Sequence, residues 1–271
     1  MDFKNRVAIV TGASSGIGAA TARDLVARGA RVALVARSAQ KLEALSRELG
    51  ADRAVSFAVD VKDRRLLEEL PRRVKERWGR LDVLINNAGV NHRGPVGERT
   101  ADELVDILET NLVAPVLLTS AALRVIEPDG MIVNVASLAG KVPLPDEATY
   151  SASKAGLRYF SRSTNAELAL HGSSVKVAAV CPGPVATGFF GEDLGAVPDI
   201  VFSQPMSTAD DVARAIVTVI EQGLPELDVP VLSGKLATAG YLSPRLYSMI
   251  RPLLERVGAR KKARYAATAG G

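Results

Sequence analysis

Short apolar runs rich in β-branched residues alternate with longer amphipathic stretches through most of this chain. A run that is apolar on both faces is typical of a strand inside a parallel sheet. The amphipathic stretches between successive runs are typical of crossover helices that cover such a sheet on both sides. The pattern therefore predicts an α/β fold, with a doubly wound, mostly parallel central sheet and helices on both faces.

The strands that we expect lie at residues 7–10, 31–35, 54–59, 82–85, 131–136, 175–180 and 229–232. Helices are expected after the first two strands and at residues 63–78, 101–125, 150–171 and 209–222. No stretch is rich enough in Gly, Ser or Pro to separate two domains. The pattern predicts one domain at residues 1–234, with a lid at about 185–206, and an extension at 235–271.

The first strand leads directly into a turn that contains Gly12, Gly16 and Gly18. A strand, a glycine-rich turn and a helix in this order are typical of a dinucleotide site, because a backbone without Cβ atoms can approach a pyrophosphate. The phosphate charge then lies at the positive end of the helix. The spacing here is T-G-x-x-x-G-x-G, and such turns also arise for packing alone, so the rest of the chain has to decide.

With 47% hydrophobic and 24% charged residues, the 271-residue chain has the composition of a soluble globular protein. Cys181 is its single cysteine and it has two histidines, so the sequence predicts neither an internal disulfide nor a metal site. We recognise no signal peptide and no uncharged run of membrane-spanning length. We expect a cytoplasmic protein.

The formal net charge of +4 is unevenly distributed. Residues 235–271 hold eight basic residues and one acidic residue, a net +7, which leaves −3 for residues 1–234. The body of the protein therefore lacks the basic excess that nucleic acid requires, and we predict no nucleic-acid partner.

Tyr150 and Lys154 are four residues apart in a predicted helix and so share one of its faces. An ammonium group at that distance stabilises a phenolate, so we expect the pKa of Tyr150 to fall from about 10 towards neutrality. Tyr150 would then act as a general acid or base, although a solvated helix face is the alternative interpretation. Ser137 follows the fifth predicted strand, at the edge where α/β sheets build their sites.

Taken together, these features resemble the short-chain dehydrogenase/reductase family over roughly residues 5–234. The segments that carry the resemblance are TGASSGIG at 11–18, Asp60-Val61, NNAG at 86–89, Asn111, Ser137, Tyr150-x-x-x-Lys154, and Pro182-Gly183 followed by Thr187. The resemblance implies a Rossmann-like domain and a nicotinamide-dependent oxidoreductase that acts on carbonyl or alcohol groups.

The resemblance also implies a role for each catalytic position. Tyr150 would protonate the substrate oxygen while a hydride reaches its carbon, and Ser137 would hydrogen-bond the carbonyl. Lys154 would lower the pKa of Tyr150 and bind the nicotinamide ribose, and Asn111 would hold a water that connects Lys154 to solvent. The implied cofactor contacts are Gly12, Ser14, Ser15, Gly16, Ile17, Gly18, Arg37, Ser38, Asp60, Val61, Asn87, Ala88, Gly89, Tyr150, Lys154, Pro182, Gly183, Val185 and Thr187. Within that set, Asp60 and Val61 would contact the adenine and Thr187 the carboxamide, and Asn87 would support the central strands.

The end of the second strand favours NADP(H) as the cofactor. Sites for NAD place Asp or Glu about 20 residues after the glycines, on the ribose 2′-hydroxyl. This chain has Ala36, Arg37 and Ser38 there. Arg37 offers a planar, bidentate donor for a 2′-phosphate, and the hydroxyls of Ser38 and Ser14 could assist it.

The predicted lid favours an apolar or bulky carbonyl substrate, because it carries many apolar side chains and no Lys or Arg. Those side chains are Phe189, Phe190, Leu194, Val197, Ile200, Val201, Phe202 and Met206. Alternatively, they only pack the lid on the domain. Reduction of 3-oxoacyl thioesters is a second interpretation of the function. A non-catalytic NADP-binding regulator is a third, which the intact Ser137, Tyr150 and Lys154 disfavour.

For the cysteine and for one of the histidines we favour a role without chemistry. Cys181 is expected to be a small buried apolar residue rather than a reactive thiol. His92 follows the NNAG motif, where a substrate contact competes with the favoured interpretation, a solvated loop histidine.

The extension at 235–271 contains an amphipathic helix. Ser243 and Pro244 are typical of a helix start, and Pro252 is expected to kink or split the helix. The apolar stripe comprises Leu242, Leu246, Met249, Ile250, Leu253, Leu254 and Val257. We expect the stripe to dock on its own domain near the lid or on a second subunit of a homo-oligomer, dimer or tetramer. Peripheral contact with an anionic membrane is the less favoured interpretation.

Overall fold

The computed structural model describes residues 1–188, 195 and 197–269, with only the backbone described at 244, 246 and 267–269. The strands are β1 (Val7–Thr11), β2 (Arg31–Ala36), β3 (Ala54–Ala58), β4 (Val83–Asn86), β5 (Met131–Val135), β6 (Lys176–Pro182) and β7 (Glu226–Val229). They form a seven-stranded sheet in the order β3-β2-β1-β4-β5-β6-β7. Every pairing is parallel. The predicted doubly wound, Rossmann-like α/β fold is therefore confirmed.

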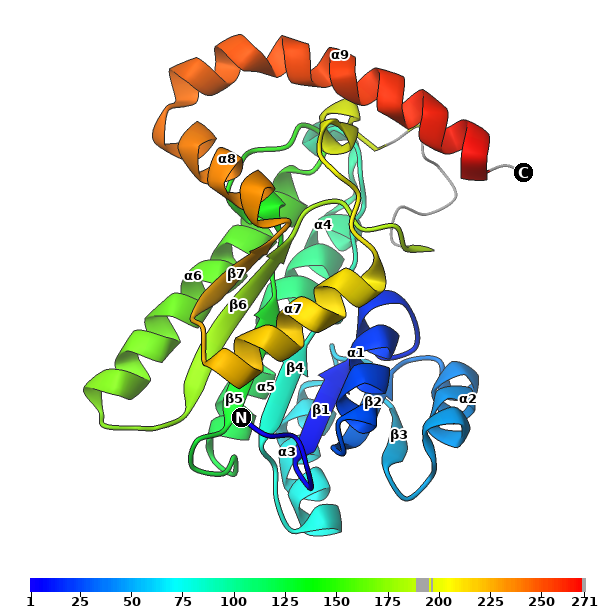
Figure 1. Ribbon diagram of the computed structural model, residues 1–271, viewed down its shortest axis with the longest axis vertical. Coiled ribbons are helices and arrows are strands. Elements are labelled where there is room, and N and C mark those ends of the chain that lie inside the picture. Colours follow the sequence, from blue (N-terminus) through cyan, green and yellow to red (C-terminus); the bar gives the residue numbers. More distant parts are fainter. Residues whose placement is uncertain (189–194, 196, 270–271) are drawn as a thin grey trace.

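Helices cover both faces of the sheet (Figure 1). They are α1 (Gly16–Ala27), α2 (Ala39–Leu49), α3 (Arg64–Trp78), α4 (Ala101–Leu108), α5 (Ala114–Leu123), α6 (Ala148–Leu170), α7 (Ala209–Gln222), α8 (Val231–Leu242) and α9 (Pro244–Ala269). Apolar side chains of α1, α2 and α7 pack with one set of alternate strand residues, which includes Ala8 and Val10. Those of α3 and α5 pack with the other set, which includes Val7 and Ile9. Alternation along each strand thus builds two cores, one on each face.

The predicted helix at 101–125 is interrupted. A π-helical turn, η2 (Glu109–Val113), separates α4 from α5 and contains Asn111. The segment Ala101–Leu123 is the part of the described chain that is long and apolar enough to span a membrane by composition. It covers the sheet instead, since α5 contributes Ala114, Leu118 and Ala122 to the core beneath α3.

The predicted last strand is wrong in position, because β7 ends at Val229 and α8 begins at Val231. Pro230 between them lacks an N–H for strand pairing and serves as the N-cap residue of α8. Residues 226–229 were not predicted as a strand because they include Glu226 and Asp228, and acidic residues are rare in strands. The predicted division at 234/235 falls inside α8.

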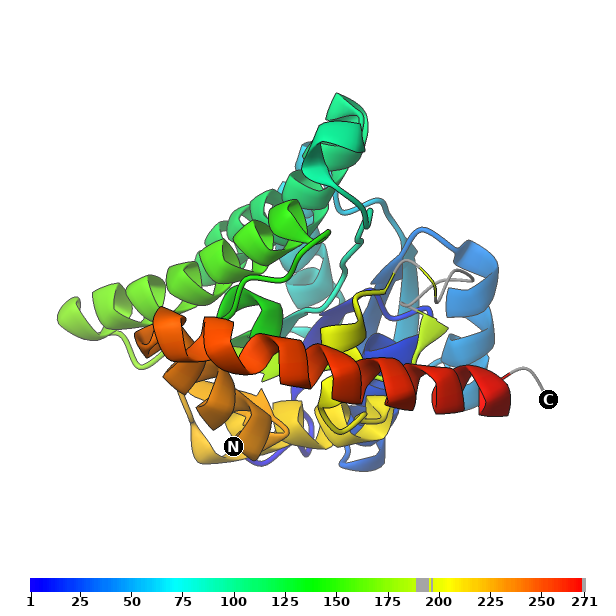
Figure 2. The same ribbon diagram turned by 90° about the horizontal axis from the view of Figure 1, so that it is seen from above.

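The C-terminal extension docks on its own domain, as one of the expected arrangements had it. Helix α9 begins at the predicted Pro244 and continues through Pro252 without being split. It crosses over the carboxyl end of the sheet (Figure 2) and packs on a short 3₁₀ helix of the lid, η6 (Asp199–Ser203).

The docking contacts come from a different part of the helix than predicted. A Cβ added to Gly258 would lie 1.8 Å from the Asp199 carbonyl oxygen, so the two backbones touch. Lys262 Nζ donates to the carbonyl oxygens of Val197 at 2.6 Å and Gly195 at 3.1 Å. The apolar stripe that was expected to dock is largely exposed, at Leu242, Met249, Ile250 and Leu253, and the Leu246 side chain lies outside the described part.

Candidate active site

A cavity of about 700 Å³ lies at the carboxyl ends of the strands. It is lined by the turn after β1, by the ends of β2 to β6, by α6 and by part of the lid. Every site residue predicted from the sequence lines it except Gly18 and Asn111, which lie directly behind its wall. A site at this edge follows from the parallel sheet, because the strand order reverses there and leaves a crevice.

The glycine turn is shaped by close approaches of neighbouring atoms to two of its glycines. Gly12 has φ +67°, and a Cβ there would lie 2.7 Å from Asn87 Nδ2. A Cβ on Gly18 would lie 2.2 Å from the Gly12 carbonyl oxygen. Asn87 Nδ2 donates to the Thr11 carbonyl oxygen at 2.9 Å, which joins β4 to β1, as predicted for Asn87. The turn therefore brings the N-terminus of α1, whose N-cap Ser15 makes no side-chain cap bond, to the cavity.

The distal end of the cavity is lined by Arg37 and Ser38, as predicted, and also by Lys41. Arg37 and Lys41 are both exposed. Lys41 was missed, although it lies four residues after Arg37, near the start of α2, where their side chains can reach the same anion. Asp60 and Val61 line the wall nearby, and Asp60 Oδ1 accepts the Lys62 N–H at 2.9 Å.

Tyr150, Ser137 and Lys154 meet at the other end of the cavity. The hydroxyls of Tyr150 and Ser137 are hydrogen-bonded to each other. Ser137 Oγ also accepts the Ala139 N–H at 3.1 Å and donates to the Pro182 carbonyl oxygen at 3.3 Å, which orients it. Lys154 Nζ donates to the Val135 carbonyl oxygen at 2.9 Å. The predicted constellation is therefore assembled in space.

The predicted fall in the Tyr150 pKa is wrong for this geometry. Burial raises the pKa of the Tyr150 hydroxyl above its ordinary value, and the charge of Glu147 raises it further. Burial also lowers the pKa of Lys154 to about 8. Lys154 Nζ is directed at a backbone carbonyl and lies 5.8 Å from the centre of the Tyr150 ring. Helical spacing placed the two groups on one face, but desolvation of both outweighs the attraction between them.

Asn111 lies behind the cavity wall and fastens it. Its Oδ1 accepts the Val90 N–H at 2.8 Å, and its Nδ2 donates to the Val90 carbonyl oxygen at 2.9 Å and to Ser153 Oγ at 3.2 Å. These bonds tie the π turn to the strand end after β4 and to α6. The water that Asn111 is predicted to hold stays a prediction.

An ion pair in the cavity wall, formed by Arg93 and Glu147, was also missed by the sequence analysis. Arg93 Nε donates to Glu147 Oε1 at 2.8 Å, and both side chains are almost fully buried. Burial raises the pKa of Glu147, and the charge of Arg93 opposes that rise. No local sequence pattern indicates this pair, since its members are 54 residues apart in the chain. The available signal was the position of Glu147 one helical turn before Tyr150, which places its carboxylate near the candidate catalytic residue.

Among the described residues of the lid, some apolar side chains pack on the protein and others line the cavity. Val197 and Phe202 are buried against Tyr265 of α9, which agrees with the alternative that lid residues pack on the protein. Val201 and Gln204 line the cavity. The predicted Phe189, Phe190 and Leu194 lie outside the described residues. Among the described residues, apolar lining at the Tyr150 end comes from Val90, Leu138, Ala139, Val142 and Leu144.

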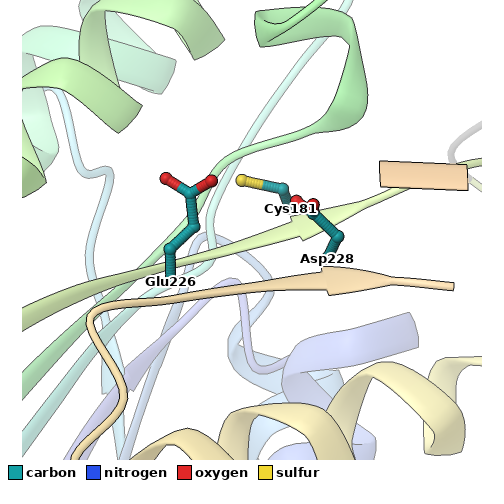
Figure 3. A group of neighbouring side chains, drawn as sticks. All are labelled: Cys181, Glu226 and Asp228. Carbon is teal, nitrogen blue, oxygen red and sulfur yellow. The ribbon is translucent and has the colours of Figure 1, made fainter. Parts of the chain in front are cut away.

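Cys181 lies outside the cavity, buried beside Glu226 and Asp228 (Figure 3). Lys141 Nζ lies 2.8 Å from Glu226 Oε1 and 2.6 Å from Asp228 Oδ1, and Arg158 Nε donates to Glu226 Oε2 at 2.8 Å. Two cations thus neutralise the two carboxylates, so this cluster is an ion-pair network. Burial raises the pKa of the Cys181 thiol to about 12, as suits the predicted inert residue.

His92 does not line the cavity, and its Nε2 lies 2.9 Å from Asp106 Oδ2. The substrate contact that was considered for His92 is absent from this geometry. The histidine is part of a surface ion-pair group that also contains Lys62.

Comparisons with known proteins agree with the fold and the site. The family model described as short chain dehydrogenase matches residues 6–195. The 3-oxoacyl-[acyl-carrier-protein] reductase FabG of Escherichia coli is 36% identical over 189 residues, which are 69% of this chain and 76% of that protein. The bovine dehydrogenase/reductase SDR family member 7B is 35% identical over 194 residues, and the match spans 68% of this chain and 59% of that protein.

A solved short-chain dehydrogenase from Burkholderia cenocepacia, in complex with NADP, has a similar structure. It superposes with a TM-score of 0.77 and 31% identity, covering 84% of this chain and 97% of that one. The chain belongs to the short-chain dehydrogenase/reductase family. It is therefore an oxidoreductase of carbonyl or alcohol groups.

Proposed function

We propose that this protein is an NADP(H)-dependent carbonyl reductase, which interconverts a ketone and the matching secondary alcohol of an apolar or bulky small molecule. The observation that carries the proposal is the hydrogen-bonded Tyr150–Ser137 pair beside buried Lys154, at one end of a cavity whose other end holds Arg37.

The residues present fit a nicotinamide dinucleotide. The turn at Gly12 leaves no room for a Cβ, and the N-terminus of α1 faces the cavity without a side-chain cap. A pyrophosphate fits such an end, where N–H groups and the helix dipole favour an anion. Arg37 and Lys41 would hold a 2′-phosphate, whereas buried Ala36 offers no acceptor to a 2′-hydroxyl.

The chemistry divides between the cofactor and the chain. A nicotinamide bound in the cavity supplies or accepts the hydride at the carbon of the substrate. Ser137 donates a hydrogen bond to the carbonyl oxygen, and the Tyr150 hydroxyl gives that oxygen its proton, so that an alcohol and a tyrosinate result. Lys154, which is buried and has its pKa lowered to about 8, carries the positive charge that stabilises the tyrosinate at neutral pH.

The substrate end of the cavity supports a largely apolar substrate with one further polar group. Val90, Leu138, Val142 and Leu144 supply apolar surface there. The ion pair of Arg93 and Glu147, together with Gln204, supplies the polar contacts. Reduction of a 3-oxoacyl thioester is the second candidate, which the similarity to the bacterial 3-oxoacyl reductase favours. A regulatory role without catalysis is disfavoured, because the catalytic constellation is assembled.

Replacing Tyr150 tests the proposal. In Tyr150→Phe the ring stays but the proton donor is lost, so turnover of aryl ketones or 3-oxoacyl thioesters with NADPH should fall by about 10²–10⁴-fold. NADPH binding, followed by fluorescence, should persist. Tyr159→Phe is the matched control, since Tyr159 lies on the same helix and is 71% exposed. A Tyr150→Phe enzyme with half the wild-type rate would contradict the proposal.

A further inference from the structure

The outward surface of α8 and α9 is both apolar and basic. We call it the α8–α9 face and define it by its exposed apolar residues, Val231, Leu232, Leu236, Leu242, Met249 and Leu253, and by its exposed basic residues, Lys235, Arg245, Arg256 and Arg260. From this surface we propose that the protein docks peripherally on an anionic lipid membrane through the α8–α9 face.

The opposite sides of both helices are already occupied, so the apolar residues have no partner within the described chain. Ser233, Gly234 and Ala237 of α8 are buried, and a Cβ on Gly234 would meet the Asp228 side chain of β7. Gly258 of α9 is in contact with the lid backbone, and Tyr265 packs on Phe202. The remaining side of each helix is turned to solvent.

The exposed apolar residues are large. Leu242 and Met249 are each 77% exposed, and Leu232 is 69% exposed. Exposed apolar side chains that occur singly need no explanation, but a group on two consecutive helices indicates a binding surface. At helical spacing, Met249 and Leu253 lie on one side of α9, with Arg245, Arg256 and Arg260 on that same side.

The charge of this face identifies the partner. Its charged residues are all basic, and the acidic Glu255 of α9 is paired with Arg251 within the helix. The segment 235–271 carries +7, against −3 for the rest of the chain. Apolar side chains flanked by Arg and Lys suit a membrane interface, where the former enter the acyl boundary and the latter meet anionic headgroups.

A second copy of the chain fits this face less well. In a two-fold symmetric dimer the same patch lies on both sides of the interface. Arg245, Arg256 and Arg260 would then be brought towards the same three residues of the other copy, with no acidic side chain on the face to offset them. An anionic surface has no such repulsion.

Docking in this way would orient the active site. The helix α9 lies over the carboxyl end of the sheet, which is also the end that holds the cavity (Figures 1 and 2). The membrane-bound protein would therefore present its cavity end towards the lipid. An apolar carbonyl compound dissolved in the bilayer would be near the cavity, a consequence that, unlike the docking itself, rests on the proposed function.

The test is co-sedimentation of the full-length protein with vesicles of phosphatidylcholine alone and of phosphatidylcholine mixed with phosphatidylglycerol. We expect binding to the anionic vesicles to be at least about tenfold stronger, and to weaken at high salt because the headgroup attraction is screened. Met249→Glu with Leu253→Glu should abolish binding. Arg256→Gln with Arg260→Gln should weaken binding several-fold. This double variant removes two positive charges and leaves the apolar positions unchanged.

The matched control is Leu170→Glu, because Leu170 is 82% exposed and lies on α6, far along the chain from this face. It should bind vesicles as the wild type does, and all variants should retain reductase activity in solution. Failure of the wild-type protein to bind anionic vesicles would overturn the proposal, as would equal binding to both vesicle types. A loss of vesicle binding in Leu170→Glu equal to that in the face variants would also overturn it. If the face variants instead halve the molecular mass in solution and no vesicle binding is seen, the face is a subunit interface.

Discussion

Arg37 is an exposed cation at the distal end of the cavity, and its side chain has no carboxylate partner among the ion pairs of the described chain. Its neighbour Ala36 is buried and uncharged, so it does not repel a phosphate as an acid at that position would. Cofactor choice therefore depends on single residues at a strand end, where the backbone is held by the sheet and the side chain is free to differ.

Arg37→Ala should weaken NADPH binding by roughly 1.5–3 kcal/mol, because the 2′-phosphate loses a charge-assisted hydrogen-bond partner. NADH binding should not change, since NADH has no 2′-phosphate. Fluorescence titration with both nucleotides measures this. The control is Arg47→Ala, an exposed arginine of α2 that does not line the cavity. Equal losses for NADPH and NADH in Arg37→Ala would be inconsistent with this role.

Lys154 should give carbonyl reduction an alkaline limb. Burial lowers its pKa to about 8, so the ammonium is lost as the pH rises through that value, and with it the charge that stabilises the tyrosinate. The kcat/KM of reduction should therefore be level below the limb and fall above about pH 8. In Lys154→Arg the charge persists, so the limb should move to higher pH. A limb that stays in place in Lys154→Arg would assign it to another group.

At the scale of elements, the site depends on contacts that join segments distant in sequence. Lys141, just after the 3₁₀ turn η3 (Leu138–Gly140) that follows Ser137, is paired with Glu226 and Asp228 of β7. A Cβ on Gly140 would lie 2.8 Å from the Ala155 backbone nitrogen, so the same turn lies tightly against α6. The contacts with β7 and α6 together therefore fix the position of Ser137 relative to Tyr150.

Helix α9 should control the shape of the lid. Gly258→Val places a side chain against the Asp199 backbone, which must separate α9 from η6 and displace Val201 and Gln204 at the cavity wall. We expect the KM for the carbonyl substrate to rise about tenfold, on the scale of losing one charge-assisted hydrogen bond. The affinity for NADPH should change much less, since its predicted phosphate contacts lie at the starts of α1 and α2.

The matched control for this experiment is Ala259→Val, because Ala259 is the next residue of α9 and is exposed. Both variants place the same valine side chain in α9. Helix propensity alone favours Gly258→Val over Ala259→Val, since glycine is the poorer helix former, so a larger rise in KM for Gly258→Val reports the contact with the lid. If the two variants have the same KM, the contact between α9 and the lid does not shape the substrate site.

At the scale of the whole molecule, Asp82 joins the two halves of the sheet at its amino end. It is completely buried, and it accepts the Val7 N–H at 2.8 Å and bonds from Arg6 at 2.7 Å and Arg80 at 2.6 Å. Burial alone would raise the pKa of this carboxyl, but the bonds from Arg80, Arg6 and Val7 together lower it. A carboxylate with a lowered pKa in the folded state stabilises the fold above its unfolded pKa.

Asp82→Asn should lower the free energy of unfolding by about 2 kcal/mol near neutral pH, because charge-assisted bonds are replaced by weaker ones. The difference from the wild type should shrink as the pH falls below about 4, because the aspartate of the unfolded chain then takes up a proton while that of the folded chain resists it. Urea unfolding at both pH values measures this. Asp52→Asn is the control, since the Asp52 side chain is 83% exposed. A difference that is independent of pH would mean that the charge of Asp82 does not matter.

The sequence by itself determined the frame of this protein. Strand runs such as Val7–Thr11 are apolar on both faces, and their alternation with amphipathic stretches leaves few folds other than a covered parallel sheet. The glycine turn, Ser137, Tyr150 and Lys154 were found because each belongs to a local pattern whose spacing the backbone geometry preserves. The homo-oligomeric state stays a prediction of the family resemblance.

Tertiary structure alone decided what depends on contacts between distant segments. Arg93 meets Glu147 across 54 residues, and β7 accepts Glu226 because Lys141 and Arg158 come from elsewhere to neutralise it. The raised pKa of Tyr150 results from burial of its hydroxyl, and the spacing of four residues to Lys154 does not show that the hydroxyl is buried. Periodicity likewise showed that α9 is amphipathic but not which side docks, because that choice is made by Gly258, where the absence of a side chain lets the helix and the lid backbone touch.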